Sequence, residues 1–191
     1  AAFRQAGAVR VTTFPELFDQ VRAFELLPLP RGRRLGVVSI TGVGCVLTAD
    51  AAGIHGLELP DLAPETLARI REVAPPWAPI RNPVDMWSTI ERVGPVEAYR
   101  QLSRLVLADP GVDMLLIQIH IPESALDPVE TFGTLREIAP DKPVVGSFFG
   151  MEPALAEYRE AMARIGIPVY DDPERAVRCL AGLCARAEHQ R

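Results

Sequence analysis

Apolar residues in this chain gather into short continuous runs that alternate with stretches of helical spacing. A short run without polar–apolar alternation is typical of a parallel strand that is covered on both faces. The predicted strands cover residues 35–40, 57–59, 112–119, 143–149 and 167–170, with 84–86 as a further candidate. The run at 112–119 is the most continuous, so we expect it at the centre of a sheet.

Helical spacing fills most of the segments between these runs. Asp127 and Asp172 each precede a proline, the usual arrangement of an N-cap and the first helical position. The predicted helices cover residues 45–54, 64–73, 95–107, 128–138, 153–165 and 173–186. Strands and helices alternating in this order predict an α/β fold with a flavodoxin-like, doubly wound, parallel five-stranded sheet. Ligands of such sheets bind beyond the carboxyl ends of the strands.

The first 34 residues differ from the rest and predict an N-terminal helical extension. Residues 14–24 have apolar positions at helical spacing, with Pro15 in the first turn. Residues 27–34 contain two prolines, a glycine and three arginines, a composition typical of an exposed linker. We therefore expect residues 1–34 to be the tail of a preceding domain plus a linker, and residues 35–191 to be one flavodoxin-type domain. The chain opens on Ala-Ala-Phe without an initiator methionine, which favours a piece of a longer polypeptide.

Composition restricts the class of partner. The 191 residues carry a net charge of −5 and are 48% hydrophobic, which is typical of a soluble globular protein and argues against nucleic acid as a partner. The longest apolar run is interrupted by Gln118 and His120 and is too short to span a membrane. Cys45, Cys179 and Cys184 have neither disulfide nor metal-site spacing, so we expect buried thiols in a reducing, cytoplasmic compartment and no metal site.

The turn Thr41-Gly42-Val43-Gly44 joins the first strand of the domain to a helix. A glycine turn that opens a helix presents backbone N–H groups and the positive end of the helix dipole to an anion, so these four residues are the candidate phosphate-binding site. The alternative is a plain turn that needs glycine for its dihedral angles. No Gly-Lys-Ser/Thr follows, and the third glycine of the dinucleotide fingerprint is missing, so neither a P-loop nor a dinucleotide site is predicted.

Other polar residues fall at the same predicted edge of the sheet. Asn82 and Asp85 belong to the tetrapeptide Asn-Pro-Val-Asp, and His120 and Ser124 follow the central strand. All four are candidates for the edge of the site. His120 has the position of an acid–base group or phosphate partner, but its position favours a histidine at the border of the core. Ser124 lies in a second loop, residues 121–124, where neighbouring carboxylates would repel phosphate.

Trp87, Phe148 and Phe149 are aromatic residues predicted at this edge. They suit either a flat cofactor, such as the flavin of an FMN-binding electron-transfer module, or ordinary packing at the base of a loop. Against the flavin, the glycine turn lacks the run of hydroxyl residues that such a site needs.

A family resemblance rests on five segments, residues 34–50, 82–86, 107–116, 141–145 and 166–170. The chain resembles the NDP-forming acyl-CoA synthetases, and in particular the second flavodoxin-like domain of the ADP-forming acetate–CoA ligase type, which is related to succinyl-CoA synthetase. This family interconverts acyl-CoA, ADP and phosphate with acid, CoA and ATP through an acyl phosphate and a phosphohistidine. The resemblance assigns that histidine to the preceding domain, upstream of residue 1, so it implies no catalytic residue in this chain.

What the resemblance implies is a non-nucleophile domain that packs on the phosphohistidine domain and orients phosphate through residues 41–44. Its partners would be the phosphohistidine, CoA-binding and ATP-grasp domains of the same enzyme, in a homo-oligomer. The parent would use CoA, ADP or ATP, and magnesium. Residues 121–124 lack the paired glycines that succinyl-CoA synthetase has in the corresponding loop. This departure leaves a further alternative open, a regulatory or degenerate ligand-sensing domain of an acyltransferase fusion.

Overall fold

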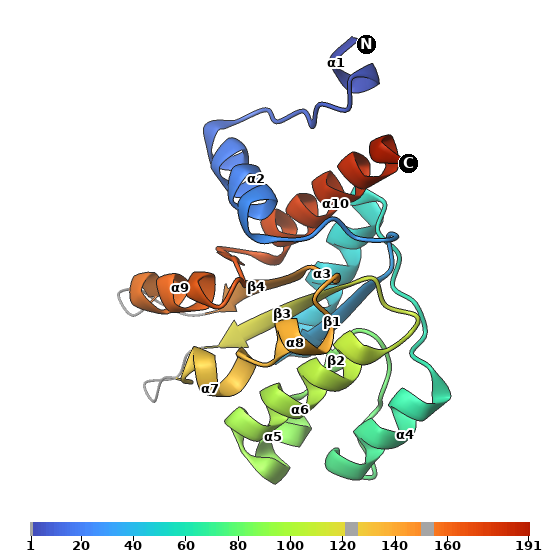
Figure 1. Cartoon of the computed structure of the whole chain (residues 1–191). Helices are drawn as coiled ribbons and strands as arrows, with labels where there is room; N and C mark the ends of the chain where they lie inside the picture. Colours follow the sequence, from blue (N-terminus) through green and yellow to red (C-terminus); the bar gives the residue numbers. More distant parts are fainter. Residues whose placement is uncertain (1, 121–125, 150–154) are drawn as a thin grey trace.

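The structure, a computed structural model, describes residues 2–120, 126–149 and 155–191 (Figure 1). In these residues strands and helices alternate from residue 35 onward, as the spacing predicts. The strands are β1 (Leu35–Ser39), β2 (Val84–Asp85), β3 (Met114–His120), β4 (Val144–Phe149) and β5 (Val169–Tyr170). The helices are α1 (Ala2–Gln5), α2 (Phe14–Leu26), α3 (Gly42–His55), α4 (Pro64–Val73), α5 (Trp87–Val93), α6 (Pro95–Ala108), α7 (Pro128–Phe132), α8 (Leu135–Ile138), α9 (Leu155–Arg164) and α10 (Pro173–Gln190).

The sheet is parallel throughout, with its strands in the order β2-β1-β3-β4-β5. This is the flavodoxin strand order, so the predicted doubly wound fold is confirmed. β3 lies at the centre, paired with β1 from Leu35↔Met114 to Val38↔Ile117 and with β4 on its other side. The side chains of β3 are fully buried from Met114 to Ile119, because helices cover both faces of this strand.

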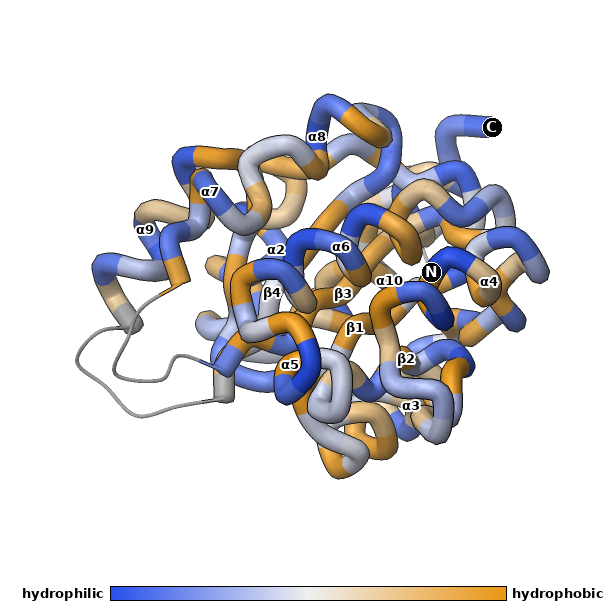
Figure 2. Tube along the Cα trace, turned by 90° about the horizontal axis from the view of Figure 1, so that it is seen from below, coloured by the Kyte–Doolittle hydropathy of each residue, from blue (hydrophilic) through white to orange (hydrophobic). Residues whose placement is uncertain are grey.

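Successive residues of a strand point to opposite faces of the sheet, and here each face has its own helical layer. α3 and α10 cover one face, where Val37 and Leu116 are buried. The helices from α4 to α9 cover the other face, where Val38 and Ile117 join the core around Leu102 of α6. Seen from below in Figure 2, α6 lies in front of β1 and β3. The carboxyl ends of the strands therefore share one edge, which α3, α5 and α10 reach with their first residues.

Helix α2 lies on α10 and not on the sheet (Figure 1). The Asp19 carboxylate accepts two hydrogen bonds from the Arg175 guanidinium, at 2.7 and 2.9 Å, and the Gln20 side chain donates to the Cys179 carbonyl at 3.3 Å. Pro15 lies in the first turn of α2, as predicted. The N-terminal helical extension is thus present and is held to the domain by these polar contacts and by the burial of Ala23 and Leu27 in the core. The division of the chain at residue 34 stays a prediction.

The strand predicted at residues 57–59 is wrong. This segment makes a single parallel bridge, Arg34↔Glu58, in which the Leu35 N–H donates to the Glu58 carbonyl at 2.7 Å. Pro60 follows within two residues and has no N–H with which to extend the pairing. The segment therefore crosses the start of β1 without becoming a sixth strand.

Three helix predictions also need correction. The helix expected at 128–138 is interrupted by Gly133 and Thr134, two weak helix formers, and becomes α7 and α8. α5 is absent from the predicted helices, since the sequence analysis places Trp87 only at the edge of the sheet. α3 begins at Gly42, so the glycine turn is itself the first turn of the helix.

No helix in the described residues combines the length and the apolar composition needed to cross a membrane. The three cysteines are free thiols. Cys179 and Cys184 are buried as expected, while Cys45 is only half-buried. Burial raises the pKa of Cys179 to about 12 and that of Cys184 to about 11, so both thiols stay protonated and unreactive near neutral pH.

Candidate functional site

The start of α3 is built from the predicted glycine turn. Thr41 has extended backbone angles, φ −143° and ψ 149°, and its Oγ1 accepts the Gly44 N–H at 2.9 Å. Its carbonyl accepts the Cys45 N–H at 3.1 Å. The N–H groups of Gly42 and Val43 have no hydrogen-bond partner among the described residues. These two donors, next to the carboxyl end of β1, are what the turn offers to an anion.

Charge around the starts of the helices differs from one helix to another. The first turn of α3 contains no acidic residue, whereas those of α7, α9 and α10 each contain a glutamate. α7 and α10 are also capped by Asp127 and Asp172, which accept backbone N–H groups at 2.8 Å. Carboxylates there already neutralise the positive end of the helix dipole. Among these four helices, only α3 has no acidic residue in its own cap or first turn.

A buried polar network supports the first turn of α3, and the sequence prediction missed it. Gln118 on β3 accepts the Ser39 hydroxyl at 2.5 Å, and its amide donates to the Gly44 carbonyl at 2.9 Å and to the Thr48 hydroxyl at 2.5 Å. Ser39 in turn accepts the Thr41 N–H at 3.2 Å. The signal in the sequence is a single polar residue inside an apolar strand, which by itself does not identify its partners.

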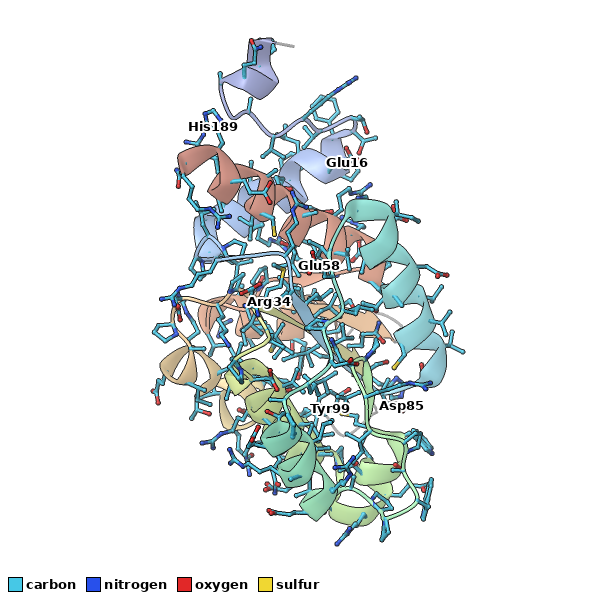
Figure 3. All side chains as sticks on the ribbon, turned by 90° about the vertical axis from the view of Figure 1, so that its right-hand side faces the viewer. Glu16, Arg34, Glu58, Asp85, Tyr99 and His189 are labelled. Carbon is cyan, nitrogen blue, oxygen red and sulfur yellow. The ribbon has the colours of Figure 1, made fainter. Side chains whose placement is uncertain are left out.

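Asp85 lies at the predicted edge, close to the lower end of α3 in Figure 3. It is the register partner of Ser39, at the carboxyl end of the sheet. Its Oδ1 accepts the N–H of Trp87, the first residue of α5, at 3.1 Å. Its Oδ2 lies 3.4 Å from the point where a side chain on Gly42 would begin. The structure thus brings Asp85 and the glycine turn together.

Asn82 occupies a different place. Its Oδ1 accepts the Val37 N–H at 2.9 Å, and its Nδ2 donates to the carbonyls of Leu35 and Pro60 at 2.8 and 3.1 Å. Leu35 and Val37 lie in the first part of β1 and Pro60 lies before α4, whereas Thr41 follows the end of β1. Asn82 therefore has a structural role along β1, and the structure does not bring it to the turn.

His120 stands at the carboxyl end of β3 with an exposed side chain. Its backbone N–H donates to the Tyr99 hydroxyl at 2.9 Å, and that hydroxyl donates to the Gln118 carbonyl at 3.0 Å. Burial raises the pKa of Tyr99, so this hydroxyl remains a neutral hydrogen-bonding group. His120 is at the predicted edge, one strand away from the glycine turn. Ser124 lies outside the described residues.

The described side chains of Phe148 and Trp87 do not frame a flavin site. Phe148 is 5% exposed and packs edge-on against Tyr158, with ring centroids 5.6 Å apart. The Arg159 guanidinium covers the Phe148 ring at 5.7 Å. Trp87 is 54% exposed at the start of α5, and the side chain of Phe149 lies outside the description. Because protein atoms enclose Phe148, the aromatic pair required by the flavin alternative is not available.

In the described part of the chain, no three His, Cys, Asp or Glu side chains gather as ligands of a metal ion. What the site contains is a helix start with two unused N–H donors, a neighbouring carboxylate and a buried amide beneath. Such an arrangement can bind and orient an anion.

Comparison with known proteins identifies the family. Residues 37–172 match the family model of the Ligase-CoA domain. The chain belongs to this family. It is 34% identical over 193 residues to an ADP-forming acetate–CoA ligase II of Archaeoglobus fulgidus, a match that covers 100% of this chain and 28% of the relative. The alpha subunit of an ADP-forming acetate–CoA ligase II of Pyrococcus furiosus is 33% identical, over 99% of this chain and 41% of the subunit.

Two solved structures superpose closely on this chain. PH0766 from Pyrococcus horikoshii OT3 superposes with a TM-score of 0.87 at 30% identity, covering 98% of this chain and 43% of that one. A dinucleotide-forming acetyl-coenzyme A synthetase 1 of Ca. Korarchaeum cryptofilum, solved in complex with phosphate and ADP, gives a TM-score of 0.81 at 27% identity. That match covers 99% of this chain and 40% of the synthetase chain. The chain thus spans less than half of the relatives it matches, and the resemblance to ADP-forming acetate–CoA ligases is confirmed.

Proposed function

We propose that this chain is the non-nucleophile domain of an ADP-forming acyl-CoA synthetase. The reaction is acyl-CoA + ADP + phosphate ⇌ acid + CoA + ATP. In this proposal the domain packs on a phosphohistidine domain and directs the start of α3 at the phosphoryl group. The observation that carries it is the first turn of α3, where Gly42 and Val43 offer N–H donors that no described residue uses, in a helix with no acid in its cap or first turn.

The helix start acts on phosphate through charge and direction. A helix N-terminus carries roughly half a positive charge, and its free N–H groups point along the axis toward the ligand. The N–H groups of Gly42 and Val43 would bind two phosphoryl oxygens and so orient the phosphoryl group for transfer. Since these donors are fixed before the phosphate arrives, little reorganisation is needed as charge develops.

The nucleophilic histidine belongs to another domain in this proposal. His55 ends α3, about 20 Å from its start at 1.5 Å per residue. His189 lies in the last turn of α10, near the C-terminus. His120 remains an edge residue that could contact the phosphoryl group after the neighbouring domain docks. The phosphohistidine, CoA-binding and ATP-grasp domains would lie in the same cytoplasmic enzyme, a homo-oligomer that uses CoA, ADP or ATP, and magnesium. The greater length of the relatives supports additional domains.

A pair of variants at Val43 tests the proposal in the full-length enzyme. Val43 is the second residue of α3 and is 66% exposed, so a change of side chain leaves the fold intact. Val43→Asp and Val43→Asn have nearly the same shape and differ by one negative charge. We expect Val43→Asp to raise the KM for phosphate about tenfold, since the added carboxylate competes for the same helix end. Val43→Asn should stay within about twofold of wild type.

The measurement is ATP formation from acetyl-CoA and ADP at varied phosphate. The thermal midpoint serves as the folding control, since Asp near a helix start stabilises the helix. Equal phosphate KM values for both variants would reject α3 as the phosphate contact and would favour the regulatory alternative.

A further inference from the structure

Gln118 is an unusual residue for its position. It lies in the middle of the central strand β3, is 0% exposed, and is flanked by Ile117 and Ile119. A primary amide in such a place is tolerated when each of its polar atoms has a partner. The partners of Gln118 all come from β1 and α3, on the face of the sheet that α3 covers.

The contacts of Gln118 converge on the first two turns of α3. Its Oε1 accepts the Ser39 hydroxyl, and its Nε2 donates both to the Gly44 carbonyl at 2.9 Å and to the Thr48 hydroxyl at 2.5 Å. Gly44 and Thr48 are one turn apart on the same side of the helix. One amide therefore fixes both the distance of α3 from the sheet and the rotation of α3 about its own axis.

The Gln118 amide lies so close to Gly44 that it leaves no room for a side chain there. A Cβ added at Gly44 would lie 1.8 Å from Gln118 Oε1 and 2.5 Å from the Ser39 hydroxyl. At Gly42, by contrast, the nearest atom would be Asp85 Oδ2 at the ordinary distance of 3.4 Å. The second glycine of the turn is thus required by the approach of Gln118 from inside the protein. The first glycine faces the carboxyl edge, where the unused N–H groups lie.

We propose that Gln118 is the positioning residue of the phosphate-facing turn. It holds the first turn of α3 against β3, so that the Gly42 and Val43 N–H groups keep one direction. The role of this turn in phosphate binding rests on the proposed function. The hydrogen bonds of Gln118 with Gly44 and Thr48, which we call the clamp, are a property of the isolated chain. The two parts are tested separately.

The clamp is tested by amide hydrogen exchange of the 191-residue chain. Gln118→Met replaces the amide by an apolar side chain of similar length, and Thr48→Val removes one of its partners with little change of volume. We expect Gln118→Met to speed exchange of the Gly44 and Cys45 amides at least tenfold, and Thr48→Val to have a smaller effect in the same direction. Ser147→Ala is the matched control.

Ser147 is the register partner of Gln118 on β4, is equally buried, and its hydroxyl has no hydrogen-bond partner among the described residues. Its removal should leave exchange at Gly44 unchanged. Exchange at Gly44 that is the same in Gln118→Met and wild type overturns the inference.

A second pair of variants tests why residue 44 is glycine. The Gln118 side chain could exclude a larger residue there, or the phosphate could require glycine beside it. Gly44→Ala should unfold or strongly destabilise the chain because its Cβ meets the Gln118 side chain. In a Gln118→Ala background the same change should be tolerated, because the Gln118 side chain is gone and the Ser39 hydroxyl that it held can rotate away from the new Cβ. Alanine is also the better helix former. Failure of Gln118→Ala to relieve Gly44→Ala would contradict the match between these two residues.

The functional part is read in the full-length enzyme. Gln118→Met should raise the KM for phosphate about tenfold with the KM for acetyl-CoA unchanged, and Ser147→Ala should alter neither. Where Val43→Asp impairs phosphate use and Gln118→Met does not, the positioning role is rejected while the proposed function stands. Where neither variant affects phosphate, the proposed function fails, and exchange at Gly44 still decides the clamp.

Discussion

Asn82 completes the hydrogen bonding of β1 at Val37, with its side-chain Oδ1 accepting the Val37 N–H at 2.9 Å. The neighbouring strand β2 pairs with β1 only at Val38 and Ser39, so the earlier residues of β1 have no strand on that side. The Asn82 amide takes the place of the missing strand and also donates to the Leu35 carbonyl. Asn-Pro-Val-Asp therefore divides into an asparagine that completes the sheet edge and an aspartate that lies beside the site.

Replacement of Asn82 should destabilise the fold. Asn82→Asp keeps an acceptor for Val37 but removes both donor hydrogens, and it brings a carboxylate close to the Leu35 carbonyl. We expect a loss of about 2 kcal/mol in the free energy of unfolding, since buried backbone groups lose their partners. Urea unfolding of the 191-residue chain measures this, with the exposed neighbour change Arg81→Gln as a control expected within about 0.5 kcal/mol. An Asn82→Asp midpoint equal to that of wild type would contradict the role in β1.

The fold was predictable because its signals are local. The apolar run that became β3 and the Asp–Pro starts of α7 and α10 each identify an element without knowledge of its neighbours. α5 was not predicted because it has only seven residues, too few for a clear helical period.

The candidate site was predictable only in part. The glycine turn and Asp85 could be assigned to one edge, since parallel strands end on the same side. The role of Gln118 depends on contacts with Ser39 and Thr48, which lie 79 and 70 residues away along the chain. No spacing rule identifies such partners before the sheet is assembled. For the same reason, the structural role of Asn82 could not be predicted, because its partner Val37 is 45 residues away along the chain.

The Thr41 cap provides a direct test of how α3 begins. Its Oγ1 accepts the Gly44 N–H at 2.9 Å, so Thr41→Ala should cost about 1 kcal/mol of stability. Thr41→Ser keeps the hydroxyl and should remain within about 0.5 kcal/mol of wild type. Thr13→Ala, which removes the longer and exposed cap of α2 at 3.3 Å, offers a matched comparison with a smaller expected cost. Chemical denaturation ranks the three variants, and a Thr41→Ser as unstable as Thr41→Ala would show that the hydroxyl does not cap α3.

Attachment of α2 depends on the pair Asp19 and Arg175. Asp19 is 8% exposed and accepts both Arg175 contacts, so Asp19→Asn weakens the strongest polar link between α2 and α10. We expect faster limited proteolysis within residues 27–34, with a protected fragment that begins after the cut. The sheet core itself should keep its cooperative unfolding. Glu25→Gln, a change on the exposed part of α2, is the control that should leave the cleavage rate unaltered. Equal cleavage of the Asp19→Asn variant and wild type would mean that apolar contacts alone hold α2.

Asp113 gives the chain a pH-dependent contribution to stability. It is 6% exposed and accepts the Arg34 backbone N–H at 3.0 Å and the guanidinium at 2.8 and 2.9 Å. Burial by itself raises the pKa of Asp113, but these hydrogen bonds outweigh it, and the pKa is lowered overall. A lowered folded-state pKa stabilises the protein above the unfolded value of about 3.9, and this contribution is lost as the pH falls through the folded value.

Asp113→Asn should therefore cost about 2 kcal/mol at pH 7, a figure kept modest because Arg34 remains 44% exposed. The same variant should cost progressively less below about pH 4, where the wild-type carboxylate also becomes protonated. Urea unfolding at pH 7, 5 and 3 measures this trend. Asp141→Asn breaks the exposed pair with Arg31 and should stay within about 0.5 kcal/mol at every pH, because exposed ion pairs contribute little. A cost for Asp113→Asn that is the same at pH 3 as at pH 7 would show that packing, and not the charged pair with Arg34, accounts for the stabilisation.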